Sequence, residues 1–322
     1  MNIRNVAIIA HVDHGKTTMV DQLFKTAHLF RDNESSAERM MDNNDLERER
    51  GITILAKATG IQYKDYHINI LDTPGHADFG GEVERIMNMV DGCLLLIDAF
   101  ESTMPQTRFV LKKAIEARVK PIVVINKVDR PNVDIEKAVD DVLDLFINLD
   151  APEEYLDFKV VYTSGLLGTS SLSPDPNDQT PGMEAILDLI ISEIPSPRVN
   201  PQGHLQFQPS LLDYSDFVGR IGIGLIKTGT LILNQNVALA RLDGSIKLGK
   251  VMKIFKFVGM SRIELETATA GDIVGIAGIV DINVGETLCE PNFVVPLPKI
   301  AISEPTLQMT FAPNSSPFVG QS

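Results

Sequence analysis

The chain has 322 residues, 44% of them hydrophobic, and carries a formal net charge of −14 from 43 acidic and 29 basic residues. This length suggests two domains, and no apolar run is long enough to span a bilayer, so we expect a soluble, cytoplasmic protein without a membrane partner. The acidic balance argues against broad electrostatic binding to nucleic acid, but it does not exclude contact with a local basic face of a partner. The cysteines, Cys93 and Cys289, lie far apart, which fits a reducing compartment and offers no metal-ligand spacing.

The first apolar run, residues 5–9, leads into Ala10–Thr18 with the sequence AHVDHGKTT. A short strand, a loop that closes on Gly15-Lys16-Thr17 and a following helix are typical of a phosphate-binding loop. Lys16 can then reach the phosphates, and the Thr17 hydroxyl can ligate Mg²⁺. Ala10 stands where this pattern usually has its first glycine, which alanine allows if its φ stays negative. Taken alone, the motif is also compatible with a chance Gly-Lys-Thr on a surface loop.

Strands and helices alternate from here to about residue 194, a pattern that predicts a doubly wound α/β sheet with helices on both faces. We expect helices over 16–30, 82–90, 106–117, 135–149 and 183–194, and strands over 60–63, 67–71, 92–98, 121–125 and 159–162. The charged stretch 31–51 is either a solvated loop or a switch that orders with a γ-phosphate and Mg²⁺. The polar stretch 164–181 is expected to be a loop or a partly ordered insertion.

Beyond a stiff linker at 195–201, helices give way to short strands separated by Gly, Asp and Asn turns. The expected strands are 207–211, 217–226, 236–242, 246–257 and 273–279, which predicts a small β-barrel. We expect the α/β domain to cover residues 1–196 and the barrel domain 203–295. Residues 300–322 would hold the first strand, 306–311, of a third domain, since a lone strand cannot bury a core.

Polar clusters follow four of the expected strands: the phosphate loop, Asp72–His76 (DTPGH), Asn126–Asp129 (NKVD) and Thr163–Gly165. Because the carboxyl ends of parallel strands meet at one edge of a sheet, these clusters predict a single ligand site. Their order and spacing resemble the GTPase domain of translation factors. The chain as a whole resembles the BipA/TypA family of ribosome-associated translational GTPases, in the stretches Asn126–Pro131, Leu212–Gly229 and Glu304–Gly320.

This resemblance implies a P-loop GTPase, stimulated by the ribosome, that acts in translation or in large ribosomal subunit assembly under stress. Its ligands would be GTP, GDP and Mg²⁺. The partner of a longer form would be the 70S ribosome or a large-subunit precursor with its rRNA, and we expect a monomer. Two alternatives stay open: a GTP switch whose hydrolysis is incidental, and an elongation or recycling factor.

The same resemblance implies roles for individual residues. His76 would orient the attacking water, although a structural loop histidine is the alternative, and the Asp129 carboxylate would accept the N1–H and 2-amino group of guanine. Relatives usually carry alanine at the position of Gly165. The residues expected to take part in catalysis are Lys16, Thr53, Gly75 and His76, and those expected to ligate Mg²⁺ are Thr17, Thr53 and Asp72. Nucleotide binding is expected from Asp13, His14, Gly15, Lys16, Thr17, Thr18, Asn126, Lys127, Asp129, Ser164, Gly165 and Leu166.

Overall fold

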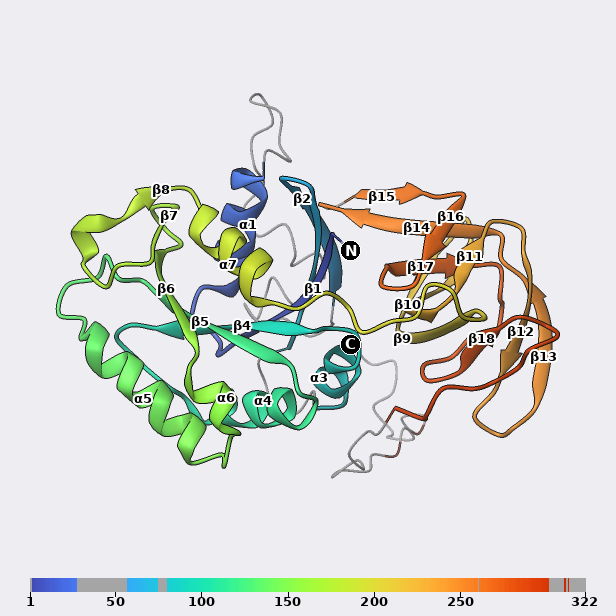
Figure 1. Ribbon diagram of the computed structural model, residues 1–322, viewed down its shortest axis with the longest axis horizontal. Helices are drawn as coiled ribbons and strands as arrows, with labels where there is room; N and C mark the ends of the chain where they lie inside the picture. Colours follow the sequence, from blue (N-terminus) through green and yellow to red (C-terminus); the bar gives the residue numbers. More distant parts are fainter. Residues whose placement is uncertain are drawn as a thin grey trace, which may run out of the picture.

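The computed structural model describes residues 2–27, 57–74, 80–259, 261–300, 310 and 312. They form an α/β part and a barrel-like β part that lie side by side (Figure 1). The strands of the α/β part are β1 (Ile3–Ala10), β2 (Lys57–Tyr63), β3 (Tyr66–Asp72), β4 (Gly92–Asp98), β5 (Lys120–Asn126), β6 (Lys159–Ser164), β7 (Thr169–Ser171) and β8 (Thr180–Pro181). Its helices are α1 (Lys16–Thr26), α3 (Gly80–Met87), α4 (Pro105–Glu116), α5 (Ile135–Ile147), α6 (Glu153–Leu156), α7 (Glu184–Glu193) and the 3₁₀ turn η2 (Pro176–Asp178).

The strands of the α/β part form one sheet in the order β2-β3-β1-β4-β5-β6-β7-β8. The five strands from β3 to β6 run parallel, whereas β2, β7 and β8 extend the sheet antiparallel at its two edges. One buried cluster packs α1 and α7 against the sheet, and a second packs α3, α4 and α5. The predicted doubly wound sheet is therefore confirmed, and the ends of β1, β3, β5 and β6 meet at one edge.

The helices follow from local sequence. In α5, buried Ala138, Val142 and Leu145 recur at spacings of three and four, which puts them on one face. The Asp134 side chain caps this helix by accepting a hydrogen bond of 3.0 Å from the Lys137 amide. In α4, Pro105 occupies the first turn, where its missing amide would have no partner in the helix.

The segment 164–181, expected to be a loop or a partly ordered insertion, contains β7, η2 and β8. Its polar side chains hydrogen-bond the backbone of the hairpin: Thr180 Oγ1 donates to the Ser170 carbonyl at 2.9 Å, and Ser170 Oγ donates to the Gly182 carbonyl at 2.7 Å. These bonds hold the hairpin together, although its strands lack the alternating apolar pattern of most strands. The stretch 31–51, expected to be a solvated loop or a switch, lies outside the described residues, and so does the expected strand at 306–311 except for Thr310.

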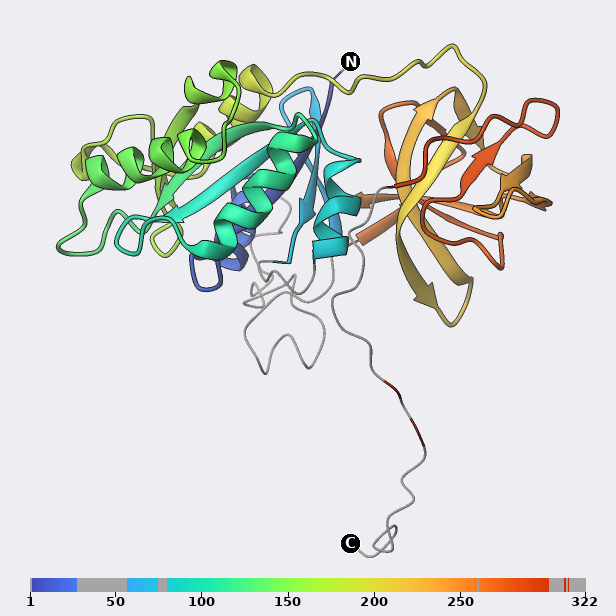
Figure 2. The ribbon, with the colours of Figure 1, turned by 90° about the horizontal axis from the view of Figure 1, so that it is seen from below.

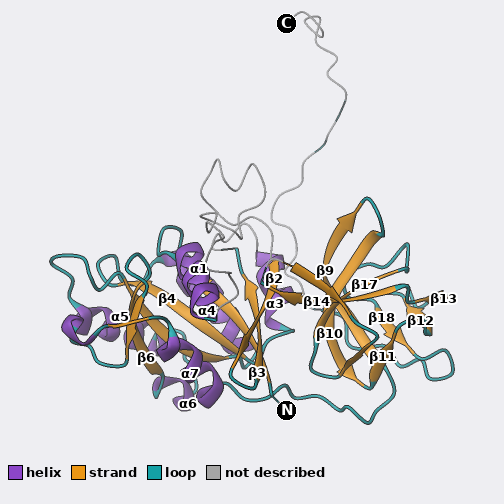
Figure 3. Ribbon diagram, turned by 90° about the horizontal axis from the view of Figure 1, so that it is seen from above, coloured by secondary structure: helices purple, strands orange, loops and turns teal. Residues whose placement is uncertain are grey.

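The described part of the chain after α7 contains strands and loops but no helix (Figure 3). The predicted barrel is confirmed as an eight-stranded antiparallel sheet in the order β13-β12-β18-β9-β10-β17-β14-β15, with β11 and β16 as a separate pair. The expected single strand 246–257 is divided into two, and β11, β15, β16 and β18 were not expected. The strands are β9 (Gln206–Ser215), β10 (Gly219–Thr228), β11 (Thr230–Ile232), β12 (Asn236–Ala240), β13 (Ile246–Lys250), β14 (Lys253–Val258), β15 (Ser261–Glu264), β16 (Thr267–Thr269), β17 (Ile273–Ala277) and β18 (Thr287–Cys289).

The linker after α7 crosses to the barrel and enters β9 (Figure 2). It is held at both ends, because Arg4 Nη1 donates to Ser196 Oγ at 3.0 Å and the Asn200 amide donates to the Lys227 carbonyl at 3.2 Å. A single buried apolar cluster contains Ile86 of α3 and Leu211 of β9, so the two parts share a core at their contact. No helix in the described ranges is long and apolar enough to cross a membrane.

Candidate functional site

The loop between β1 and α1 has a backbone that requires glycine at its last position. Gly15 has a φ of 94°, and a Cβ there would lie 2.5 Å from Asn126 Nδ2. Ala10 is the last residue of β1 and is not in the left-handed region, so alanine is compatible with the loop. Since α1 begins at Lys16, the unpaired amides of its first turn lie at the end of the loop, where they can bind an anion.

Lys16 and Asp72, which belong to two of the polar clusters expected at one sheet edge, meet beside this loop. Lys16 Nζ lies 2.8 Å from Asp72 Oδ1 and donates to the Thr73 carbonyl at 2.6 Å. Asp72 ends β3 and is 2% exposed. The contact therefore joins the start of α1 to the end of a neighbouring strand, and it places an ammonium group and a carboxylate together.

Three of the expected residues, Thr53, Gly75 and His76, lie outside the described residues. Thr17 is half-buried in the first turn of α1, and Thr18 is exposed. Within the described ranges no group of three or more His, Cys, Asp or Glu side chains could by itself hold a metal ion. The donor set expected for Mg²⁺ consists of hydroxyl and carboxylate oxygens, which suit a hard cation that keeps its other positions for water and phosphate.

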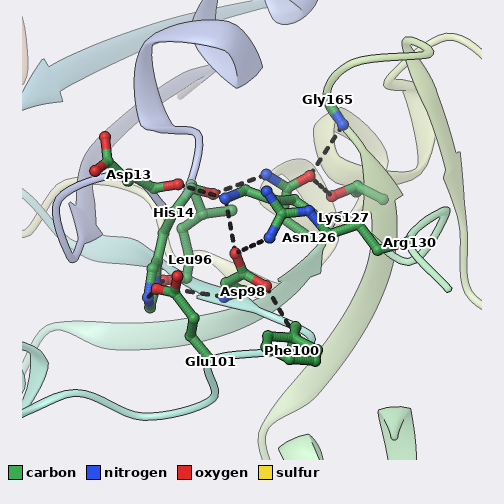
Figure 4. A network of polar contacts seen from close by, with 11 residues as sticks. Asp13, His14, Leu96, Asp98, Phe100, Glu101, Asn126, Lys127, Arg130 and Gly165 are labelled. Atoms are coloured by element: carbon green, nitrogen blue, oxygen red, sulfur yellow. Dashed lines mark hydrogen bonds and ion pairs between the residues drawn. The ribbon is translucent and has the colours of Figure 1, made fainter. Parts of the chain in front are cut away.

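Asn126, at the end of β5, ties three segments together. Its Nδ2 donates to the His14 carbonyl at 2.8 Å, and its Oδ1 accepts from the Gly165 amide at 2.9 Å and from Thr163 Oγ1 at 3.1 Å (Figure 4). Asn126 thus links the NKVD loop to the phosphate loop. The same amide group also fixes the loop after β6.

Lys127 makes a second link to the phosphate loop. Its Nζ donates to the Asp13 carbonyl and lies 2.7 Å from Asp98 Oδ2 (Figure 4). Lys127 has a φ of 64° and Asp13 a φ of 66°, so both loops bend through the left-handed region where they meet. Asp98 also accepts from Arg130 Nη1 at 3.3 Å.

The His14 side chain points to β4. Its Nδ1 lies 3.3 Å from both the Leu96 carbonyl and the Asp98 amide, and its Nε2 lies 3.5 Å from Glu101 Oε2 (Figure 4). Burial lowers the pKa of this imidazole, because a charged ring would lose its hydration there. His14 therefore contributes backbone groups to the loop, while its ring packs the loop onto the sheet.

The rim of the site carries Asp129 and Leu166, which are both exposed. Ser164, by contrast, is 1% exposed, and its hydroxyl accepts from the Leu167 amide at 3.1 Å. Gln22 of α1 donates to the Gly165 carbonyl at 3.1 Å. The loop after β6 is thereby held against α1.

Sequence reasoning assigned no role to Asp98, Arg130 or Gln22. Asp98 could have been found, because it is a polar residue that ends an apolar strand at the sheet edge where the other polar clusters lie. Its register partner in β5 is Asn126. Arg130 and Gln22 carry no comparable signal, because their contacts are made across segments far apart in the sequence.

A phosphate-type loop and an Asn-Lys-x-Asp loop, joined at the edge of a doubly wound sheet, define a nucleotide-binding protein of the P-loop class. Residues 1–196 match the family model for the elongation factor Tu GTP binding domain, and residues 219–289 match that for elongation factor Tu domain 2. The chain therefore belongs to the family of the elongation factor Tu GTP binding domain.

The most similar relatives compared include proteins named large ribosomal subunit assembly factor BipA. The one from Bacillus subtilis (strain 168) is 60% identical over 320 residues, which are 99% of this chain and 52% of the relative. Those from Synechocystis sp. and Salmonella typhimurium are 55% and 52% identical over 99% of this chain, covering 53% and 52% of their own lengths. The expected resemblance to the BipA group is confirmed, and the chain spans about half the length of these relatives.

Proposed function

We propose that this chain is the nucleotide-binding part of a ribosome-associated GTPase of the BipA type, a monomer that works in the cytoplasm. Residues 1–196 would form the GTP-binding domain and residues 203–295 the barrel domain, with the start of a third domain at 300–322. The observation that carries the proposal is the junction of the two loops: Asn126 bonds the His14 carbonyl at 2.8 Å, and Lys127 bonds the Asp13 carbonyl. This junction supports the proposal, because it would bring base recognition and phosphate binding to one place.

Phosphoryl transfer requires positioning and neutralisation of charge more than covalent chemistry. Lys16 would bind the β- and γ-phosphates together with the amides of the loop that ends at Gly15. Thr17, Thr53 and Asp72 would hold Mg²⁺, whose charge helps to neutralise the phosphate oxygens. The amide of Gly75 would bind the γ-phosphate.

Guanine selectivity would come from Asp129. Its carboxylate can only accept hydrogen bonds, and guanine offers two donors, N1–H and the 2-amino group. Adenine would leave that carboxylate unpaired, a mismatch that can lower binding by about 10⁴-fold. The stem of Lys127 would lie along the base, and the backbone from Ser164 to Leu166 would contact the guanine oxygen.

Hydrolysis would use His76 to orient the attacking water, with the ribosome or a large-subunit precursor positioning that side chain. BipA relatives carry the name of a large ribosomal subunit assembly factor, which supports this class of partner. The proposed role is in translation or in large ribosomal subunit assembly under stress.

The test is a titration of the chain with fluorescent GDP and ADP, with and without Mg²⁺, followed by phosphate release from GTP with and without 70S ribosomes. We expect GDP to bind at least 10³-fold more tightly than ADP. Lys16→Ala should abolish GTP binding, whereas Lys64→Ala, at an exposed lysine paired with Asp188, should leave it unchanged. Equal affinity for GDP and ADP would overturn the proposal. Nucleotide binding without multiple turnover on ribosomes would favour a GTP switch.

A further inference from the structure

The carboxylate of Asp98 lies at the centre of the junction between the two loops. It ends β4, the strand between β1 and β5, and its side chain is fully buried. Its Oδ2 lies 2.7 Å from Lys127 Nζ and 3.3 Å from Arg130 Nη1, and its Oδ1 accepts from the Phe100 amide at 2.8 Å (Figure 4). Both carboxylate oxygens are thus occupied.

A buried carboxylate is unfavourable unless it is paired and hydrogen-bonded. Burial raises the pKa of Asp98, but hydrogen bonds from Lys127 and the Phe100 amide, with the charges of Lys127 and Arg130, outweigh it, so the pKa lies below its ordinary value. The Lys127 side chain is 19% exposed and that of Arg130 is 45% exposed. Both cations reach solvent, whereas the Asp98 carboxylate does not, so its charge is stabilised mainly by these two cations and the Phe100 amide.

Lys127 is a flexible side chain that would have to lie in one conformation beside a bound base. Two acceptors from different segments, the Asp13 carbonyl and Asp98 Oδ2, fix its ammonium group. Ordering a long side chain before the ligand arrives removes that entropy loss from the binding step. Asp98 is fixed in turn, because its own amide lies 3.3 Å from the buried ring of His14.

We propose that Asp98 is a positioning residue of the nucleotide site, which holds Lys127 in its binding conformation and thereby strengthens guanine-nucleotide binding. This inference rests on the proposed function. Asp98 itself would touch neither base nor phosphate, so its effect on affinity would pass through Lys127.

The first test is the GDP affinity of Asp98→Asn, which keeps the size of the side chain and removes its charge. We expect binding about 3- to 10-fold weaker, a range set by the cost of immobilising one long side chain, with most of the loss in faster dissociation. The matched control is Asp188→Asn, which removes the carboxylate of an exposed lysine pair on α7, and we expect unchanged affinity. If wild type binds GDP and Asp98→Asn binds it equally well, the inference is wrong while the proposed function stands; if wild type binds no GDP, the proposed function itself fails.

The second test separates positioning from a general structural role. In a Lys127→Met background, Asp98→Asn should cause no further loss of GDP affinity, because its effect passes through Lys127. Additive losses would overturn the inference. Should Asp98→Asn unfold the chain, Asp98→Asn with Arg130→Gln restores the charge balance around this position. We expect this double variant to bind GDP about 3- to 10-fold more weakly than wild type, as expected for Asp98→Asn alone. Wild-type affinity of the double variant would overturn the inference.

Discussion

The Gly259 amide donates a hydrogen bond of 2.8 Å to the Gly60 carbonyl and so joins the barrel to the edge strand β2 of the α/β sheet. Thr59, which is next to Gly60 on β2, donates from its Oγ1 to the Gly259 carbonyl. β2 pairs along its whole length with β3, the strand that ends at Asp72. The barrel is therefore attached to the hairpin that carries one of the expected metal ligands.

Gly60→Ala should weaken this contact. A Cβ at Gly60 would lie 2.2 Å from the Phe257 carbonyl oxygen, and the backbone atom can move away only by separating β2 from the barrel. We expect the free energy of unfolding to fall by about 1–3 kcal/mol, the usual cost of overpacking. The measurement is urea unfolding followed by circular dichroism.

The control for this prediction is Gly165→Ala in the loop after β6. Its Cβ would lie 3.5 Å from the nearest atom, Asn126 Oδ1, which is an ordinary contact distance. The change in stability should stay within about 0.5 kcal/mol. Equal stability of the two variants would show that the backbone around Gly60 accommodates a Cβ without a loss of unfolding free energy.

The sheet and its functional edge could be predicted because their signals are local. The central strands β4 and β5 are nearly continuous apolar runs buried on both faces, and β4 has the bounds that the sequence predicts. The polar clusters follow these runs directly, so parallel pairing alone brings them together. Lys16 and Asp72 are 56 residues apart in sequence and meet for this reason.

The remaining features depend on contacts that no local pattern reports. The strands β7 and β8 are polar, and their hairpin depends on side-chain bonds such as that of Thr180 to the Ser170 carbonyl. The direction of the His14 ring is set by β4, more than 80 residues away. The role proposed for Asp98 likewise depends on its register with Asn126 across two strands.

Replacement of Asp129 by asparagine should change the base that the site prefers. An amide would place a donor opposite the donors of guanine, whereas xanthine offers an oxygen at that position. We expect GDP affinity to fall by about 10²-fold or more, of the order seen when buried polar groups lose their partners, and XDP affinity to rise. Competition binding of GDP and XDP measures both. Asp144→Asn, at an exposed carboxylate of α5, should keep the wild-type preference, and an unchanged ratio in Asp129→Asn would exclude this loop from base recognition.

His76→Ala separates binding from catalysis. If His76 orients the attacking water, GTP affinity should stay within a few-fold, while ribosome-stimulated phosphate release should drop by about 100-fold. The comparison needs stopped-flow binding and phosphate release on one preparation, with His204→Ala on the barrel as the control. A parallel loss of GTP binding would give His76 a structural role instead.

The acid sensitivity of the molecule should depend on His67. This side chain of β3 is 6% exposed, and its Nε2 hydrogen-bonds Asn69 Oδ1 at 3.0 Å. Asn69 bonds Asn5 at 2.7 Å, and Asn5 bonds the Gly271 carbonyl of the barrel at 3.2 Å, so a buried polar chain crosses the contact between the two parts. Burial and the nearby charge of Lys256 lower the pKa of His67 from 6.5 to about 4.

Because the pKa of His67 is lower in the folded than in the unfolded chain, the unfolded state binds more protons between pH 6.5 and 4. The contribution of neutral His67 to the free energy of unfolding is complete above pH 6.5 and is lost as the pH falls through 4. This loss amounts to about 3 kcal/mol. His67→Gln cannot titrate and should lose correspondingly less stability between pH 7 and 5. Burial of Asp91 raises its pKa to about 6 and favours folding on acidification, but equally in both proteins, so their difference isolates His67. Urea unfolding at pH 7, 6 and 5 tests this, with His204→Gln as a surface control. Parallel pH profiles for wild type and His67→Gln would mean that the buried chain of hydrogen bonds accommodates a protonated imidazole at no cost in stability.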